Sequence, residues 1–273
     1  MASMMQAARE VLGRVLPKSW YLRVARRYEA WISAKLLGAA EYRRLKATQN
    51  AAPGGPAVLF SPPGSSYRVG VRPGTTDALV FISILARKSY EVYDPHPEPR
   101  FIIDGGANAG YSVVYFGLRH PQARIVALEP QSDNHRIATQ NIAALGERAR
   151  VLKLGLWPRK AHLRVVANER ADGHQVIEVP ESEPHDCVGI DPLTLLRESG
   201  EKRIDLLKCD IEGAELNLFA DNPDPWLEFT DCAIVEIHNA EAEQAVYTAI
   251  RRHGFHAQRH REYHVFTRRS PSA

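Results

Sequence analysis

The stretch Phe101-Ile102-Ile103-Asp104-Gly105-Gly106-Ala107-Asn108-Ala109-Gly110 decides the fold of this chain. An apolar run stops at an acid, and small residues then open an amphipathic segment. This order is typical of a β-strand, a tight turn and the start of an α-helix. Such a turn lets a ligand lie against backbone N–H groups at a helix N-terminus. The stretch therefore predicts a strand-turn-helix corner with a ligand beside it.

A second acid follows the next apolar run, because residues 124–128 end at Glu129. A carboxylate at this offset suits the two hydroxyls of a ribose. A dinucleotide fingerprint would need glycine in place of Ala107, and Asp104 would repel a pyrophosphate. S-adenosylmethionine has no phosphate and carries an ammonium and a sulfonium, so Asp104 would help to hold it. We predict an S-adenosylmethionine site; the alternative is a purely structural corner, since small residues alone make tight turns.

Composition is that of an ordinary globular protein of 273 residues, 25% of them charged and 44% apolar. The net charge of +3 is too small to indicate nucleic acid. Cys187, Cys209 and Cys232 show no C-x-x-C spacing, which favours a reducing compartment. No apolar run approaches a membrane span, and charged residues interrupt every apolar run near the N-terminus. We therefore expect a cytoplasmic protein without a signal peptide.

The N-terminal segment has an aromatic stripe at helical spacing, formed by Trp20, Val24, Tyr28 and Trp31 among many basic residues. Stripes of this kind usually pack on another part of the chain or on a second subunit. A basic amphipathic helix with tryptophans can also lie on an anionic membrane. We expect packing, and keep peripheral membrane contact as the alternative; a homodimer could form through the same helices.

The pattern divides the chain into four parts. They are a basic amphipathic helical extension (1–52), a lead-in segment with a cap helix (53–99), a catalytic domain (100–267) and a disordered tail (268–273). Thr76 or Asp77 is expected to cap the lead-in helix. From residue 100 the chain alternates strands (100–104, 124–129, 150–155, 204–209, 231–237) with helices (110–119, 132–145, 191–199, 213–220, 240–253). A hairpin is expected at 161–166 and 175–179, and an antiparallel pair at 255–258 and 262–267. Alternation of this kind predicts a parallel sheet covered by helices on both faces.

Polar residues follow two of the later predicted strands. Asp210 and Glu212 come after the strand at 204–209, and Glu236 and His238 end the strand at 231–237. Alternation puts Glu236 and His238 on the same side of their strand. Because the carboxyl ends of parallel strands meet at one edge of a sheet, we expect these side chains to converge on the cofactor corner.

Four segments in this order carry a family resemblance: Ile103-Asp104-Gly105-Gly106-Ala107-Asn108-Ala109-Gly110, Ala127-Leu128-Glu129-Pro130, Leu207-Lys208-Cys209-Asp210-Ile211-Glu212-Gly213-Ala214-Glu215 and Val235-Glu236-Ile237-His238. Over roughly residues 67–267 the chain resembles the FkbM family of S-adenosylmethionine-dependent methyltransferases. The resemblance implies a class I methyltransferase fold, a Rossmann-like doubly wound sheet of seven strands with the last antiparallel. It also implies O-methylation of a hydroxyl on a sugar, glycan or secondary metabolite.

The predicted cofactor residues are Asp104, Gly105, Gly106, Ala107, Asn108, Gly110, Glu129, Pro130 and Asp210. The family commonly has Val where Gly105 stands, a departure expected to loosen the turn and to leave the cofactor assignment intact. Leu156 and Trp157 are candidates for an apolar wall against adenine, although a tryptophan there fits a core equally well. The loops at 62–67 and 168–175 are candidates for the acceptor pocket.

The predicted catalytic residues are His238, Asp210 and Glu212. His238 is the first choice for the general base, because its unperturbed pKa lies near the working pH, and Asp210 is the second. Asp210, Glu212, Glu236 and His238 could instead hold a divalent metal. We do not favour the metal, since no compact motif such as H-x-x-x-H with an acid is present.

Two alternative functions are a nucleic-acid methyltransferase on the same fold and a non-catalytic cofactor-binding module. An amino-directed nucleic-acid enzyme would carry Asn/Asp-Pro-Pro-Tyr/Phe where Cys209-Asp210-Ile211-Glu212 stands. A cytosine-C5 enzyme would place proline before its cysteine nucleophile, whereas Cys209 follows Lys208. Acids around the site would also repel a phosphate backbone. We therefore expect a small-molecule or glycan acceptor and no nucleic acid.

Overall fold

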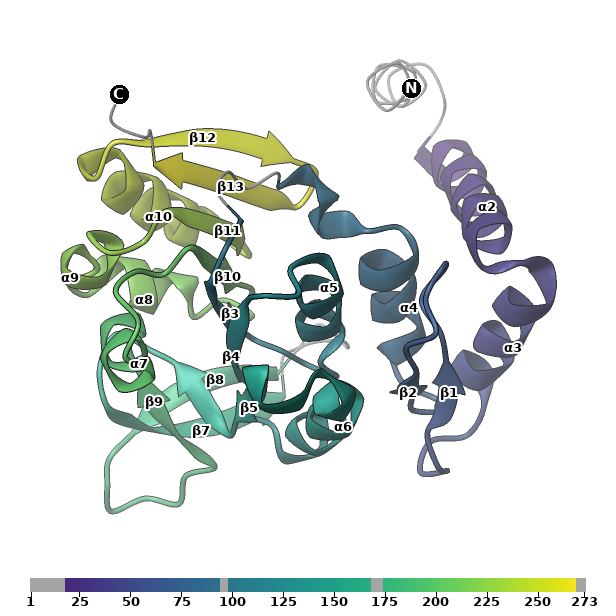
Figure 1. The fold of residues 1–273 in the computed structure, drawn as a ribbon, viewed down its shortest axis with the longest axis horizontal. Helices are drawn as coiled ribbons and strands as arrows, with labels where there is room; N and C mark the ends of the chain where they lie inside the picture. Colours follow the sequence, from purple (N-terminus) through teal and green to yellow (C-terminus); the bar gives the residue numbers. More distant parts are fainter. Residues whose placement is uncertain (1–17, 94–97, 168–173, 269–273) are drawn as a thin grey trace. The chain divides into compact units, whose positions relative to one another are not determined.

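The computed structural model describes residues 18–93, 98–167 and 174–268 (Figure 1). Residues 269–273 of the expected tail, most of the loop at 168–175 and the first part of the N-terminal extension lie outside these ranges. A tail that begins at Arg268 is wrong by one residue, because Arg268 ends a strand. The chain divides into two compact units. One comprises the residues up to Ser66 together with Val71–Arg87, and the other comprises Tyr67–Gly70 together with Lys88 onward.

The first unit is mainly helical. Its elements are α2 (Lys18–Leu37), α3 (Ala39–Asn50), β1 (Val58–Phe60), α4 (Asp77–Phe81) and the helical turn Ile82–Ala86. A short strand, β2 (Val69–Val71), crosses the boundary between the units.

The expected helix cap at Thr76 or Asp77 is wrong. Thr76 is the N-cap residue of α4, but its side chain accepts no hydrogen bond there. The Asp77 carboxylate is instead bound by the Arg72 guanidinium, with Nη2 2.7 Å from Oδ1, and by the Arg72 backbone N–H. The hydroxyl that accepts from the first turn is that of Thr75, 3.2 Å from the Asp77 backbone nitrogen.

The second unit contains the expected alternation of strands and helices. Its helices and helical turns are Ser89–Val92, α5 (Tyr111–Arg119), α6 (Ser132–Ile142), Ala143–Arg148, α7 (Pro192–Ser199), α8 (Glu215–Ala220), α9 (Asp224–Leu227) and α10 (Ala240–Arg252). Its strands are β3 (Phe101–Gly105), β4 (Arg124–Leu128), β5 (Ala149–Leu152), β6 (Leu154–Leu156), β7 (Ala161–Ala167), β8 (His174–Val179), β9 (Cys187–Ile190), β10 (Leu206–Cys209), β11 (Cys232–Glu236), β12 (Phe255–His260) and β13 (Tyr263–Arg268).

Seven strands form the main sheet in the order β12-β13-β11-β10-β3-β4-β5. The pairs β11–β10, β10–β3, β3–β4 and β4–β5 are parallel, and β13 pairs antiparallel with both β11 and β12. Figure 1 shows α5 on one side of this sheet and α8 and α10 on the other. This is the predicted doubly wound sheet of the class I methyltransferase fold, with its last strand antiparallel.

The order of strands along the sheet reverses between β3 and β10, because the chain runs outward from β3 through β4 to β5 and then returns to β10. In open α/β sheets, ligands bind at such a switch point, outside the carboxyl ends of the strands. The polar residues predicted for the site follow β3, β4, β10 and β11.

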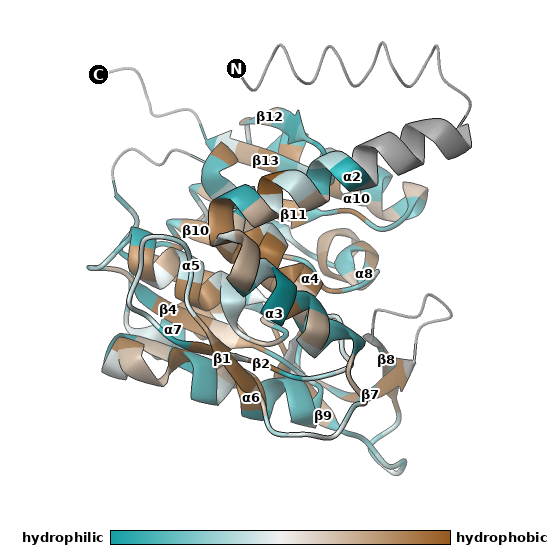
Figure 2. Cartoon of the chain, turned by 90° about the vertical axis from the view of Figure 1, so that its right-hand side faces the viewer, coloured by the Kyte–Doolittle hydropathy of each residue, from teal (hydrophilic) through white to brown (hydrophobic). Residues whose placement is uncertain are grey.

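The central strands are buried on both faces, which is why they read as nearly continuous apolar runs. Every residue of β3 and β10 is buried, including Cys209, which packs as a small apolar side chain in the main core. Figure 2 shows hydrophobic colour along β10 and β4. All three cysteines are free and buried.

A second sheet of four strands, in the order β6-β9-β7-β8, was not expected. The predicted hairpin is confirmed as the antiparallel pair β7–β8, and β9 and β6 extend it. Trp157 lies in the core of this sheet, 3% exposed, with Nε1 donating to Glu178 at 3.1 Å. An adenine wall at Trp157 is therefore wrong, because the indole is enclosed and its N–H is already used.

Only glycine fits at position 106, where the turn after β3 meets the end of β10. Gly106 has φ +77°, and a Cβ there would lie 1.8 Å from the Asp210 carbonyl oxygen. We expect Gly106→Ala to lower the free energy of unfolding by about 3 kcal/mol or more, as left-handed strain and displaced backbone add together. Chemical denaturation measures the change.

Gly200 supplies the matched control for that substitution. It has nearly the same φ, +73°, but no atom lies within 4 Å of its ideal Cβ position. Gly200→Ala should therefore cost only about 1 kcal/mol, the strain of the left-handed conformation alone. Equal losses in the two variants would show that the contact with Asp210 has no energetic weight.

Candidate active site

The turn that follows β3 is closed by hydrogen bonds within the protein. The N–H groups of Gly106 and Ala107 both donate to the Leu128 carbonyl, at 3.0 and 2.9 Å, and that of Gly110 donates to the Ala107 carbonyl at 2.7 Å. The N–H of Asn108 donates to Glu129 Oε2 at 2.8 Å. These four N–H groups are used within the protein, so they are not available to a phosphate. The expected contact between a ligand and the N–H groups in the first turn of α5 stays a prediction.

Gly105 lies against a core side chain and is not needed for the conformation of the turn. It is the last residue of β3, and a Cβ there would lie 2.6 Å from Leu156 Cδ2. The expectation that glycine loosens the turn at this position is wrong, because the left-handed conformations belong to Gly106, Asn108 and Gly110. Leu156 itself is 2% exposed and belongs to the main core, next to the turn.

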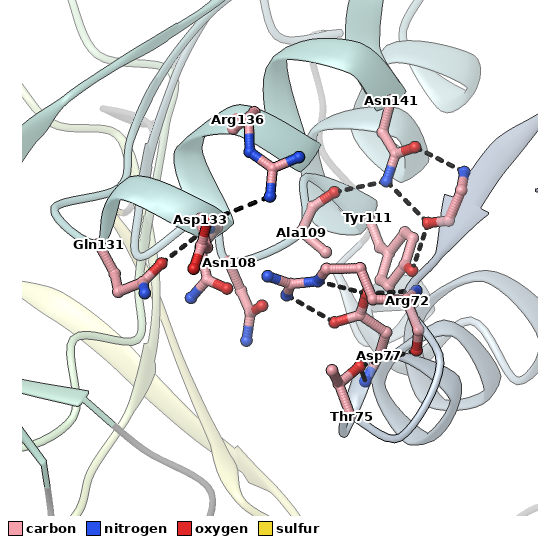
Figure 3. Close-up of polar contacts among 12 residues, drawn as sticks. Arg72, Thr75, Asp77, Asn108, Ala109, Tyr111, Gln131, Asp133, Arg136 and Asn141 are labelled. Carbon is pink, nitrogen blue, oxygen red and sulfur yellow. Dashed lines mark hydrogen bonds and ion pairs between the residues drawn. The ribbon is translucent and has the colours of Figure 1, made fainter. Parts of the chain in front are cut away.

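A buried asparagine ties the end of the turn to the segment before it (Figure 3). Asn141 Nδ2 donates to the Ala109 carbonyl at 2.8 Å and to the Gly70 carbonyl at 3.1 Å, and Asn141 Oδ1 accepts from the Gly70 N–H. The Tyr111 hydroxyl donates to the same Gly70 carbonyl at 2.8 Å. The sequence did not indicate this role, because Asn141 reads as an ordinary polar residue of a helix.

Glu129 lies where the second acid was expected, directly after β4. Its carboxylate accepts backbone hydrogen bonds from Asn108 and from Gln131, the latter at 2.9 Å. Burial raises the pKa of Glu129, and these hydrogen bonds partly offset the effect. Pro130, next to it, is half-buried. The arrangement fixes the carboxylate beside Asn108, and the Asn134 side chain also bonds to it.

Lys208 is a buried cation that the sequence analysis did not single out. Its ammonium lies 3.2 Å from Asp104 Oδ1 and 3.7 Å from Asp210 Oδ2, and it donates to the Gly105 and Gly106 carbonyls at 3.0 and 2.6 Å. Burial opposes its charge, but the two carboxylates outweigh burial and raise the pKa of Lys208. The ammonium therefore connects the first acid of the cofactor turn with the acid that follows β10.

A signal for Lys208 was present in the sequence. The strands β3 and β10 are parallel neighbours, and their register places Lys208 opposite Asp104. A lysine one residue from the end of a buried strand has no solvent to reach, so it needs an acid within the fold.

Asp104 is wholly buried, and neither of its carboxylate oxygens accepts a hydrogen bond from the described residues. Lys208 is its ion-pair partner at 3.2 Å, and two of the three ammonium N–H groups go to the glycine carbonyls. A buried carboxylate without a hydrogen-bond donor is costly unless a ligand supplies one. The ammonium of S-adenosylmethionine is such a donor, directly or through water, so these residues fit that cofactor.

His238 lies among four carboxylates after β11. Its Nδ1 is 3.0 Å from Glu215 Oε1, and its Nε2 is 3.7 Å from Asp210 and Glu212 and 3.9 Å from Glu236. Glu215 is completely buried and also accepts the backbone N–H groups of Ile211 and Gly213, both at 2.9 Å. Glu215 therefore fixes the imidazole ring so that Nε2 faces the other three acids.

The charges around His238 change its proton affinity. Burial of the ring opposes protonation, but the hydrogen bond and charge of Glu215 and the charge of Asp210 outweigh burial and raise the pKa of His238 to about 9. Burial and the charge of Asp210 raise the pKa values of Glu212 and Glu236. An ordinary imidazole pKa, on which the choice of His238 as base rested, therefore does not apply in this site.

Two tyrosines lie beside these acids and were also missed. Tyr263 faces Glu236 across the β13–β11 pairing, and its ring is 5.0 Å from that of Tyr90. Both side chains are buried, and burial raises both pKa values, with the Glu236 charge contributing at Tyr263.

The structure thus brings the predicted residues of four strand ends together. Lys208 joins Asp104 to Asp210, the ring of His238 faces Asp210, and Asn108 connects the turn to Glu129. The described residues contain one group with metal-ligand spacing, Asp210, Glu236 and His238, whose donor atoms lie within 4.8 Å of one another. Glu212, proposed with them, falls outside that group.

Strand order and a carboxylate-lined site at the switch point define a class I methyltransferase fold. A family model with the description "Methyltransferase FkbM domain" matches residues 104–263, which is more than half of the chain. The protein belongs to the FkbM methyltransferase family.

Three relatives are similar to this chain over somewhat more than half of its length. Methyltransferase 1 of Beauveria bassiana (strain ARSEF 2860) is 27% identical, with 59% of this chain and 74% of the relative covered. Methyltransferase sdnD of Sordaria araneosa is 25% identical, with 58% and 73% covered. The AMB antimetabolite synthetase AmbE of Pseudomonas aeruginosa is 25% identical, and the match covers 58% of this chain and 10% of AmbE.

Solved structures are more distant. A methyltransferase from Geobacter sulfurreducens has a TM-score of 0.38 at 15% identity, with 70% of this chain and 89% of that chain covered. The N-terminal domain of human METTL16, in complex with SAH, has a TM-score of 0.39 at 13% identity, with 78% and 76% covered.

Removing the buried ammonium should destabilise the fold. Lys208→Met leaves Asp104 buried without a counter-charge, so we expect the free energy of unfolding to fall by about 3–5 kcal/mol. Urea denaturation measures the loss. Lys202→Met, which removes an exposed lysine before the same strand, should change stability by less than about 0.5 kcal/mol.

A double variant separates the interaction between Lys208 and Asp104 from any other effect of placing methionine at position 208. If the ammonium acts on Asp104, then Asp104→Asn should cost less in the Lys208→Met background than in the wild type. Strictly additive losses would mean that the two groups do not interact, and would remove the ion pair from the account of the turn.

Proposed function

We propose that this protein is an S-adenosylmethionine-dependent O-methyltransferase that acts on a hydroxyl of a sugar, glycan or secondary metabolite. One observation carries the proposal: an oriented imidazole and the acid Asp210 lie together at the strand ends, and Lys208 connects Asp210 to the buried acid of the cofactor turn. The cofactor would supply the methyl group and its cationic charge. The chain's own residues would bind it at Asp104, Gly106, Asn108 and Glu129.

His238 is proposed as the general base. Glu215 holds the Nδ1 side of the ring, which leaves Nε2 to accept the proton of an acceptor hydroxyl. The imidazolium formed in that step lies 3.7 Å from Asp210 and Glu212, so their charges stabilise it. The same charges keep most rings protonated at neutral pH, and only the neutral fraction can act as a base.

The acceptor class follows from charge and from the relatives. Asp210, Glu212 and Glu236 make the region around His238 acidic, which disfavours phosphorylated or otherwise anionic acceptors. Nucleic acid is an unsuitable acceptor for the same reason. One relative is named an antimetabolite synthetase, which supports a small natural product rather than a macromolecule.

A divalent metal is the competing account of hydroxyl activation. Asp210, Glu236 and His238 have suitable donor atoms, and a metal there would lower the pKa of a bound hydroxyl. It would have to displace the proton of His238, which the surrounding acids favour, and Asp210 is already close to the Lys208 ammonium. We therefore propose catalysis by the imidazole without a metal.

His238→Ala should lower the turnover number about 100-fold or more, because a general base contributes at least that much. Binding of S-adenosylhomocysteine, measured by calorimetry, should remain within a few-fold of the wild type. His256→Ala removes an exposed histidine of β12 and should leave both quantities unchanged. A collapse of cofactor affinity in His238→Ala would make this residue structural.

The pH profile tests the same assignment. Because the pKa of His238 is raised to about 9, kcat/KM should increase roughly tenfold per pH unit below that value and level off above it. Glu215→Gln removes the largest interaction that favours the charged ring. Its profile should level off at lower pH and at a lower plateau. A profile with no dependence between pH 7 and 9 would contradict the imidazole as base.

Removal of metal ions by chelation distinguishes the imidazole mechanism from the metal mechanism. We expect methyl transfer to persist after treatment with EDTA and desalting, and to be unchanged by added Mg²⁺ or Mn²⁺. Titration with Mn²⁺ followed by electron paramagnetic resonance gives a readout that does not need the acceptor. Loss of activity on chelation, restored by metal, would replace the imidazole mechanism with the metal one.

A further inference from the structure

An aromatic and basic stripe runs along the exposed side of α2. Arg27, Trp31 and Lys35 follow one another at intervals of four residues, so they lie on one face of the helix. All three are exposed, and Trp31 is 58% exposed, the highest fraction among the exposed large apolar side chains of the described residues. The sequence predicted that this stripe packs on another part of the chain or on a second subunit. Within its own unit, the Trp31 side chain is not packed.

The opposite face of α2 is the one that the first unit uses. Ser33, two residues from Trp31, is 3% exposed, and its hydroxyl donates to the Glu29 carbonyl. Two residues of a helix differ in direction by about 200°. The unit therefore covers the side of α2 that carries Ser33 and leaves the side that carries Trp31 uncovered.

The side chains around Trp31 combine apolar surface with positive charge. The Lys35 ammonium lies 5.4 Å from the centre of the Trp31 ring. The Tyr28 ring stacks on the Trp31 ring, with 6.0 Å between the ring centres. A tryptophan with a polar N–H and neighbouring cations is the combination found at the boundary between lipid headgroups and acyl chains.

The charge of this region is strongly one-sided. Residues 18–50 contain two acids, Glu29 and Glu41, against eight basic residues: Lys18, Arg23, Arg26, Arg27, Lys35, Arg43, Arg44 and Lys46. Both acids already form ion pairs, Glu41 with Arg44 at 2.6 Å and Glu29 with Arg87 at 3.5 Å. The remaining cations thus have few acids nearby in sequence to neutralise them, and an anionic surface is their complement.

We propose that the stripe Arg27–Trp31–Lys35 docks this protein onto the surface of an anionic lipid bilayer. The helix would lie in the interface, with the Trp31 ring among the headgroups and the two cations on lipid phosphates. Among the described helices, none has the length and apolar character of a membrane span. In the sequence, Val24 and Trp20 precede Trp31 by seven and eleven residues, close to whole numbers of helical turns.

Sedimentation with vesicles tests this docking on the full chain. The protein should bind vesicles that contain phosphatidylglycerol and should not bind vesicles of phosphatidylcholine alone, and added salt should weaken binding. Arg27→Gln with Lys35→Gln should weaken binding roughly 25-fold, about five-fold for each cation removed. Trp31→Ser should also weaken binding to these vesicles. Because the cations remain in this variant, added salt should still weaken its binding.

Matched variants on the other unit keep the test specific. Arg136→Gln removes a highly exposed arginine of α6, and Phe229→Ser removes an exposed aromatic ring; neither should change binding. Equal losses in these controls, or no binding of the wild type to anionic vesicles, would overturn the proposal. So would a wild-type dimer in solution that Trp31→Ser converts to monomers, because the stripe would then be a subunit interface. Circular dichroism checks that α2 remains folded in each variant.

Discussion

The buried ammonium of Lys208 is the interaction on which the site depends. It stands between Asp104 and Asp210 and binds the carbonyls of Gly105 and Gly106, so one group connects the turn after β3 with the loop after β10. Asp104 is wholly buried, so without the ammonium its charge would lose its counter-charge. The sheet provides the geometry, because neighbouring parallel strands place Lys208 opposite Asp104.

A second buried charge repeats this arrangement on the acceptor side. Glu215 has no exposure, and it satisfies two backbone N–H groups at the start of α8 as well as one nitrogen of His238. Glu215 therefore sets both the position of the imidazole and its proton affinity. The site as a whole consists of fixed charges of opposite sign placed by the ends of four parallel strands, which is the form of electrostatic preorganisation that transfer reactions require.

The sequence predicted the features that depend on local pattern. The strands β3, β4, β10 and β11, the antiparallel closing pair and the convergence of Asp104, Asp210 and His238 follow from apolar runs that stop at polar residues. The single strand expected at 150–155 is wrong, because the structure divides it into β5 of the main sheet and β6 of the second sheet. The missed features depend on partners distant in the chain. Lys208 needs the register with β3, and Asp77 fails to cap its helix because Arg72 takes its carboxylate. Strand β9 is four residues long and contains Gly189, so its alternation is too short to detect. The closed N–H groups of the turn depend on the Leu128 carbonyl of the neighbouring strand.

The absence of a side chain at Gly106 brings the backbone of the cofactor turn into direct contact with the backbone of Asp210. No flexible side chain lies between them to absorb a movement. A shift of the turn by a few tenths of an ångström must be passed to the acid that faces the acceptor, and a shift of that acid must be passed back. Occupancy of one half of the site then changes the free energy of occupying the other, and by linkage the effect is equal in both directions. The two halves of the site would communicate through this backbone contact and through the Lys208 ammonium, which binds the turn and lies beside Asp210.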